Sequence, residues 1–278
     1  YVTSVCESQL LPLVEPLPKD APTASRDLRR REPCHELCRN VVRRNGPLFM
    51  AVVLRKWTGQ GWDNAGLRLR FRQSKRWYTF SLLYTPMLIV FVATIAVILG
   101  VAQVVPDHTA AINSMLLTLG ITLVPMFILS IGEEFGWRGY LEPILWSVNK
   151  HTVLNHIFTG VVWGFWHFPI LLFAPSSETN PVQLLMVVLG CVGLAIIYGQ
   201  MRLRSGSVWP CVVLHAISNA TLISVASSDL LHFNDGVSDI ISLNATSVTI
   251  TGIWLITGLL LLALVRKYPG KAVMEVRE

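Results

Sequence analysis

Residues 113–141 read NSMLLTLGITLVPMFILSIGEEFGWRGYL, and this stretch decides the kind of fold. Its first 19 residues, 113–131, carry no charged side chain. A run of this length can cross the hydrocarbon core of a bilayer as a helix. Two adjacent acids, an arginine and three glycines follow directly. Ionisable side chains at the end of such a span are expensive in lipid, so they mark a candidate functional site.

Five further stretches have similar length and apolarity: 81–105, 153–174, 182–201, 208–226 and 246–265. A shorter apolar run, 47–54, is too brief to span and is expected to be a partial or interfacial helix. Only 14% of the residues are charged, against roughly 25% in soluble domains, and the mean hydropathy is +0.51. This balance excludes a disordered chain, a nucleic-acid-binding domain and a disulfide scaffold. We expect an all-α, polytopic transmembrane bundle of about six spanning helices, plus the partial N-terminal helix.

Basic residues alternate between the connections of these spans. The loops 106–112, 175–181 and 227–245 contain no Lys or Arg, whereas every other connection contains at least two. Lys and Arg in short loops favour the cytoplasmic side of a membrane. The sequence therefore predicts a multi-pass protein, placed in the cell membrane, with the Lys- and Arg-free loops outside the cytoplasm. We expect its site to open to the cytoplasmic side.

The N-terminal part of the chain has a different composition. Residues 1–76 carry a net charge of +8 and residues 77–278 a net charge of −2. Prolines and the run Arg29-Arg30-Arg31 favour a flexible basic segment over residues 1–46, ahead of a helical domain over 47–278. The residues that carry the candidate chemistry lie within about 113–226.

Three polar clusters occur inside or at the ends of the spans: Glu133-Glu134 with Arg138, then His167, then His215 with Asn219. Residues four apart share a helix face, so Glu134 and Arg138 could form an ion pair, and His215 and Asn219 point the same way. Glu133, about 100° round the helix, would face something else. Each cluster alone could be a helix anchor, a core histidine or interhelical glue.

The depths of these residues require particular helix boundaries if the clusters are to meet in one cavity. We expect the helix of span two to continue through 140–146, which carries Glu133 inward. We also expect span three to begin late, near His156, so that His167 is not too deep. Small residues at Gly132, Gly136, Gly139, Gly160 and Gly164 would let neighbouring helices approach closely. The histidines at positions 108, 151, 156 and 232 need no special role.

A carboxylate, two imidazoles and a carboxamide in a pocket of low dielectric constant suit hydrolysis. Glu133 can accept a proton from water, and a histidine can share that task. The other histidine, with Asn219, can donate to a developing oxyanion. The same atoms could instead hold zinc through Glu133, His167 and His215, with an open position for water. Residue types alone do not separate these two alternatives.

The ordered set Glu133-Glu134-x-x-x-Arg138, Trp163-x-x-x-His167 and His215-x-x-x-Asn219 resembles the CPBP family of intramembrane proteases. This CAAX-processing and bacteriocin-processing group includes the type II CAAX prenyl endopeptidases. The resemblance covers roughly residues 65–265. The family motif commonly has Phe where this chain has Trp163, a departure that keeps the aromatic character.

The resemblance implies a membrane endopeptidase (a hydrolase) in which Glu133 and His167 activate the attacking water. His215 and Asn219 would stabilise the oxyanion, while Glu134 and Arg138 would support the site. The family is named as metalloproteases, yet a glutamate-activated water without bound metal is an equal alternative to zinc. The implied partners are the lipid bilayer and a membrane-associated or lipidated peptide substrate, with no nucleic acid. The competing class is a non-catalytic scaffold or transporter that uses the same residues as interhelical glue or proton relay.

Overall fold

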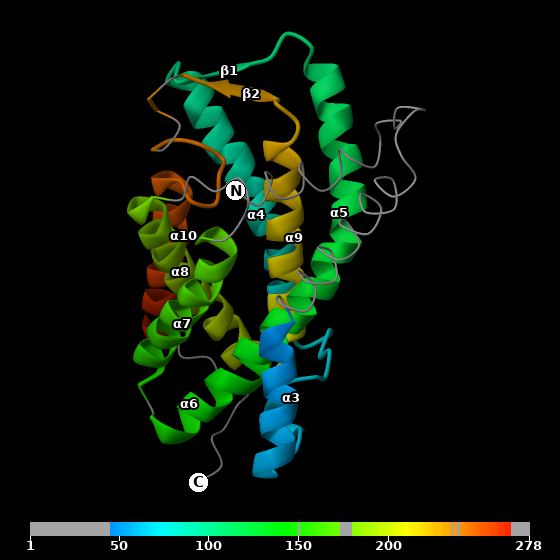
Figure 1. Cartoon of the computed structure of the whole chain (residues 1–278), viewed down its shortest axis with the longest axis vertical. Coiled ribbons are helices and arrows are strands. Elements are labelled where there is room, and N and C mark those ends of the chain that lie inside the picture. Colours follow the sequence, from blue (N-terminus) through cyan, green and yellow to red (C-terminus); the bar gives the residue numbers. More distant parts are fainter. Residues whose placement is uncertain (1–44, 150, 173–179, 235, 238–239, 268–278) are drawn as a thin grey trace, which may run out of the picture.

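The structure is a computed structural model that describes residues 45–149, 151–172, 180–234, 236–237 and 240–267. The predicted basic segment 1–46 lies almost wholly outside the described residues. The described chain is an all-α bundle with a single pair of short strands, as the apolar spans predicted. Its helices fall into two neighbouring groups, α4–α9–α5 and α7–α8–α10 (Figure 1).

The first described helix is α3 (Gly46–Thr58), which has Pro47 in its first turn and is followed by Gly59 in a left-handed conformation. It occupies the place of the predicted partial helix and packs against the end of α5. A short 3₁₀ turn, η2 (Asp63–Ala65), follows it. The next helix, α4 (Lys75–Ile98), stops short of the predicted boundary at residue 105.

The early end of α4 has a local cause. Gly100 adopts φ 69°, a conformation that glycine reaches without steric cost and that reverses the chain. Strand β1 (Ala102–Val104) then pairs antiparallel with β2 (Leu231–Phe233), in a register that places Gln103 opposite His232. The two strands tie the loop before α5 to the loop after α9, at the upper end of the molecule in Figure 1.

The predicted continuation of span two is confirmed. Helix α5 (His108–Gly136) passes without a break into a π-helical turn, η3 (Trp137–Leu141), and then into α6 (Glu142–Val148). The late start expected for span three is wrong, because α7 (Thr152–Leu172) begins almost directly after α6. Its first turns are helical because they pack on α6, where His156 bonds to Glu142.

The remaining helices follow the predicted spans within a few residues. They are α8 (Pro181–Ser205), α9 (Trp209–Ala226) and α10 (Val248–Lys267). Two of the glycines expected to permit close packing do so between α7 and α8. A Cβ on Gly160 would lie 2.5 Å from the Cα of Val192, and one on Gly164 would lie 2.8 Å from the Cα of Val188. The glycines of the acidic cluster likewise face other segments, since Gly136 contacts Pro47 of α3 and Gly139 lies against Ala65.

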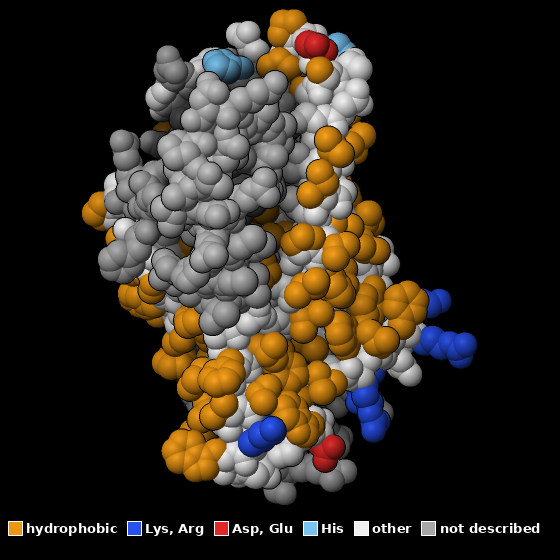
Figure 2. All heavy atoms as spheres, turned by 45° about the vertical axis from the view of Figure 1, so that its right-hand side comes forward, with side chains coloured by type: hydrophobic (Ala, Val, Ile, Leu, Met, Phe, Trp, Pro, Cys, Tyr) orange, Lys and Arg blue, Asp and Glu red, His pale blue; other side chains and the backbone are white. Residues whose placement is uncertain are grey.

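Four of the described helical rods are long and apolar enough to cross a bilayer: α4, the rod His108–Val148, α8 and α9. Helices α7 and α10 correspond to the other two predicted spans, but they are not among these four long apolar rods. Large apolar side chains on the outer faces of α4 and α5 are about two-thirds exposed, among them Met87, Val90 and Leu117. Figure 2 shows such side chains over much of one side of the molecule, with Lys and Arg at its lower part. These faces suit lipid, and the protein is an integral membrane protein.

Candidate active site

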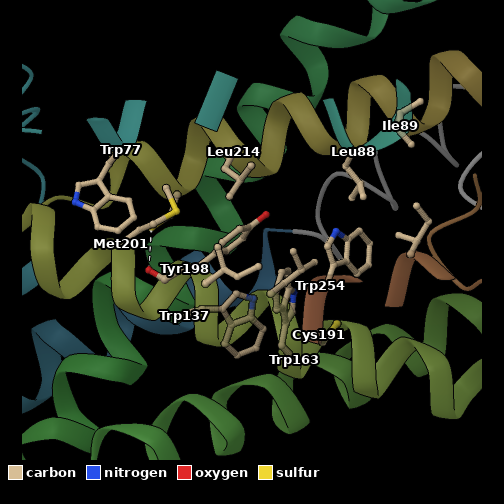
Figure 3. Packing of buried hydrophobic residues seen from close by; sticks show 14 of the residues in the cluster. Trp77, Leu88, Ile89, Trp137, Trp163, Cys191, Tyr198, Met201, Leu214 and Trp254 are labelled. Carbon is tan, nitrogen blue, oxygen red and sulfur yellow. Dashed lines mark hydrogen bonds between the residues drawn. The ribbon is translucent and has the colours of Figure 1, made fainter. Parts of the chain in front are cut away.

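Three helices bring the predicted residues to one cavity. Glu133 from the end of α5, His167 from α7, and His215 and Asn219 from α9 all line a cavity of about 150 Å³. The cavity has room for several water molecules. Its wall also contains Trp163, Cys191, Tyr198 and Trp254, which lie together in Figure 3. Glu134 and Arg138 are fully buried behind this wall.

The carboxylate of Glu133 is held by a tryptophan. Only 3% of the residue is exposed, and its Oε2 accepts a hydrogen bond of 2.9 Å from the indole Nε1 of Trp163 on α7. This contact joins residues 30 positions apart. Position 163 of the motif was expected to supply only an aromatic ring. Trp163 also donates a hydrogen bond to Glu133, the candidate base.

The predicted ion pair between Glu134 and Arg138 is present. The Nη1 of Arg138 donates to Oε1 of Glu134 at 3.1 Å, and both side chains are inaccessible to solvent. The same oxygen also bonds to Nδ1 of His215 at 2.8 Å, a contact between α5 and α9 that sequence spacing did not predict. Glu134 thus holds the imidazole of His215 in place, and its charge balances that of Arg138.

The guanidinium of Arg138 is sandwiched by aromatic rings. Its Cζ lies 4.5 Å from the ring centroid of Trp163 and 4.7 Å from that of Tyr198. Cation–π contacts of this kind are strengthened by burial. Since Trp163 also bonds to Glu133, the structure links Arg138 to both acids of the motif.

His167 is half-buried and fixed by its own helix. Its Nδ1 lies 2.8 Å from the carbonyl oxygen of Trp163, one turn earlier, so this nitrogen carries the hydrogen in the neutral ring. The Nε2 atom is then the one with the lone pair, which can accept a proton. A core histidine would make the same backbone bond, but the ring of His167 also lines the cavity.

Two arginines support the π-helical turn that follows the acidic pair. The Nε of Arg202 donates to the carbonyl of Arg138 at 3.1 Å, and Arg55 of α3 donates to the carbonyl of Gly139. A π-turn shifts the helical hydrogen-bond register, and such turns occur frequently at functional sites. The two bonds therefore stabilise the segment that sets the position of Arg138.

One expectation about the histidines is wrong. His156, expected to need no special role, is fully buried, with Nδ1 3.2 Å from Oε1 of Glu142 and Nε2 3.0 Å from the amide nitrogen of Gln200. This polar cluster lies outside the residues that line the cavity. No signal in the sequence indicated it, because its members lie on α6, α7 and α8.

Zinc held by Glu133, His167 and His215, and a water activated without metal, stay the two alternatives for this site. Among the residues that the structure describes, no group of three or more His, Cys, Asp or Glu side chains could hold a metal ion. Within the expected set, Nδ1 of His215 bonds to Glu134 and Oε2 of Glu133 bonds to Trp163. A metal-binding histidine commonly bonds to a carboxylate through its other ring nitrogen, so the bond between His215 and Glu134 is compatible with both alternatives.

The described lining of the cavity extends toward one end of the bundle. Beyond the site, its described lining continues through Leu171 and Ala226 to the segment 243–246. These residues lie at the end of the bundle opposite the basic loops. On the other side, fully buried Arg138 and Met201 fill the interior. The described lining therefore leads away from the end with the basic loops, and the opening to the cytoplasmic side stays a prediction.

A comparison with known protein families matches residues 114–221 to the type II CAAX prenyl endopeptidase Rce1-like family. This stretch is an Rce1-like domain. It contains all six candidate site residues and helices α7, α8 and most of α9, so the predicted family is confirmed. The Rce1-like domain implies a membrane protease in general. A comparison with curated proteins gave no match.

Proposed function

We propose that this protein is an intramembrane endopeptidase that hydrolyses a peptide bond of a membrane-associated or lipidated substrate, using a water activated by Glu133 and His167. The observation that carries the proposal is the convergence of Glu133, His167, His215 and Asn219 on one cavity. The Rce1-like domain gives independent support at the level of the family.

In the first step, the water oxygen attacks the peptide carbonyl carbon while a proton of the water passes to the Glu133 carboxylate, with Nε2 of His167 as a second acceptor. A carboxylate within hydrogen-bond reach of a water molecule can take up this proton. The carbonyl oxygen becomes an oxyanion. Nδ2 of Asn219 donates to it, and His215, held in place by the carboxylate of Glu134, is the second group of this oxyanion site.

In the second step, the carbon–nitrogen bond breaks as the tetrahedral intermediate collapses. The amine leaves with the proton that Glu133 had taken from water, so the carboxylate is regenerated and no other group changes. Arg138 and Glu134 do not touch the reacting atoms in this scheme. They hold His215 and the wall of the cavity.

A scaffold or transporter explains less of the arrangement. The bond between Glu134 and His215 joins two helices, as interhelical glue would. Such a role does not need Glu133 and Asn219 to face a cavity with room for water. Hydrolysis gives both residues a use.

The test is cleavage of a panel of membrane-tethered peptides by the purified protein in liposomes. We expect cleavage by the parent protein and a loss of at least about a hundredfold in Glu133→Gln, because the amide cannot accept the proton. Asp63→Asn, an exposed carboxylate on η2, is the matched control and should retain activity. A metal chelator should leave cleavage unchanged. Equal activity of Glu133→Gln and the parent would reject the proposal.

A further inference from the structure

The proposed mechanism gives no role to the hydrogen bond that the indole of Trp163 donates to Glu133. Trp163 is 2% exposed and makes three separate contacts within the site. Its indole Nε1 donates to Glu133, its backbone carbonyl bonds to His167, and its ring stacks on the guanidinium of Arg138. Among the described residues, Trp163 is the one that these contacts connect to both Glu133 and His167. These are the two groups that the mechanism assigns to activating the water.

We propose that Trp163 is the positioning residue for the general base, and that its indole Nε1–H holds the Glu133 carboxylate in the orientation that takes the proton from water. The proposal rests on the proposed function. An indole is a hydrogen-bond donor only. It can therefore hold Oε2 of Glu133 without competing for the proton that the carboxylate accepts.

The indole is itself held from two sides. The guanidinium of Arg138 lies against its face at 4.5 Å, and the ring of Tyr198 lies 5.9 Å from it, centroid to centroid. Gly164, the next residue on α7, lets the helix approach α8 closely. A donor with so little rotational freedom fixes the direction of the carboxylate better than water would, since a misplacement of about 1 Å can cost a hundredfold in rate.

The substitution Trp163→Phe isolates this contact. Phenylalanine keeps an aromatic face for Arg138 and the backbone carbonyl for His167, and removes only the N–H and part of the ring. Phenylalanine is apolar, aromatic and smaller than tryptophan, so we expect the variant to fold. Trp77→Phe is the matched control, because Trp77 is also buried, lies outside the cavity lining, and within the described residues its Nε1 has no hydrogen-bond partner.

The kinetic arm measures kcat and KM separately for the two variants on one cleaved peptide. We expect Trp163→Phe to lower kcat about tenfold or more, with KM within about twofold, because only the reacting geometry is disturbed. Trp77→Phe should change neither. A purely structural role for Trp163 predicts instead a loss of thermal stability with no separate loss of kcat. That result, or equal kcat in both variants, would overturn the proposal.

A spectroscopic arm does not depend on turnover. In protein labelled with ¹⁵N-tryptophan, the indole N–H signal that disappears in Trp163→Phe should shift in Glu133→Gln, because its acceptor changes from a carboxylate to a neutral amide. The Trp77 signal should stay in place. A Trp163 signal that does not move would show that the bond is absent, which overturns the proposal. If the parent cleaves no peptide, the proposed function fails while this arm still reports on the contact.

Discussion

Glu133 and Glu134 are adjacent in the chain, yet their carboxylates have different surroundings. Glu133 faces the cavity and accepts from a neutral indole. Glu134 is inaccessible and bonds to a guanidinium and an imidazole. One acid faces the cavity, and the other lies beside buried positive charge.

This difference predicts that replacing each glutamate by glutamine has a different effect on stability and on turnover. Glu134→Gln leaves Arg138 with a weakened counter-charge, so unfolding in detergent should show a loss of about 3 kcal/mol. Glu133→Gln keeps an acceptor oxygen for Trp163 and should lose much less stability, while losing turnover. Thermal unfolding and peptide cleavage, measured on the same preparations, check both. If the two variants lost equal stability and equal activity, this division would be wrong.

His156 and His167 lie on the same helix and also differ in role. His156→Ala leaves the carboxylate of Glu142 without its imidazole and opens a void, a cost of roughly 3 kcal/mol. Its turnover per folded molecule should stay near that of the parent. His167→Ala should show the converse, a large loss of turnover and a small loss of stability. His232→Ala, an exposed histidine on β2, should change neither.

At the scale of elements, the rod from α5 through η3 to α6 carries three of the six site residues into the bundle. Hydropathy alone ends the span at residue 131, but the helix continues to Val148. It can do so because its polar groups pair with other elements: Glu134 with His215, Glu142 with His156, and the carbonyl of Arg138 with Arg202. Satisfied polar groups tolerate depths that unpaired ones do not.

The contact between α7 and α8 is set by glycine. Gly160→Ala would place its Cβ 2.5 Å from the Cα of Val192. This distance is well below van der Waals contact, so the helices must separate. We expect the melting temperature in detergent to fall by several degrees, and cleavage to fall because α7 carries His167. Gly120→Ala on α5 meets nothing within 4 Å and should be neutral or slightly stabilising, since Ala favours helix by about 0.5–1 kcal/mol. Equal effects of the two substitutions would show that close packing is not the cause.

At the scale of the whole molecule, the basic residues and the described lining of the cavity lie toward opposite ends of the bundle. Basic residues gather at the end with α3 and α6, and the described cavity lining runs toward the end with β1, β2 and residues 243–246 (Figure 1). If the basic end is cytoplasmic, as the loop charges predict, substrate would reach the site from the other side of the membrane or from within the bilayer.

Single cysteines in an otherwise cysteine-free protein test this orientation on intact cells. Asn244→Cys, exposed and at the cavity lining, should react with a membrane-impermeant thiol reagent. Arg68→Cys, exposed in the basic connection before α4, should react only after the cells are made permeable. The reverse pattern would invert the topology.

Much of this molecule could be predicted because the information is local. Apolar runs long enough to span predicted the helices, since lipid offers no partner for backbone groups outside a helix. The spacing of Glu134 and Arg138 predicted their ion pair, because residues four apart share a helix face. The order of the three motifs led to the family, which the Rce1-like match confirmed.

The remaining features depend on contacts between distant segments, which no local pattern encodes. His215 meets Glu134 across 81 residues, and Trp163 meets Glu133 across 30. The start of α7 and the burial of His156 follow from packing on α6, and the pairing of β1 with β2 joins the loop before α5 to the loop after α9. Hydropathy reports the cost of placing one residue in lipid. It does not report which partner removes that cost, and only the packed bundle decides that.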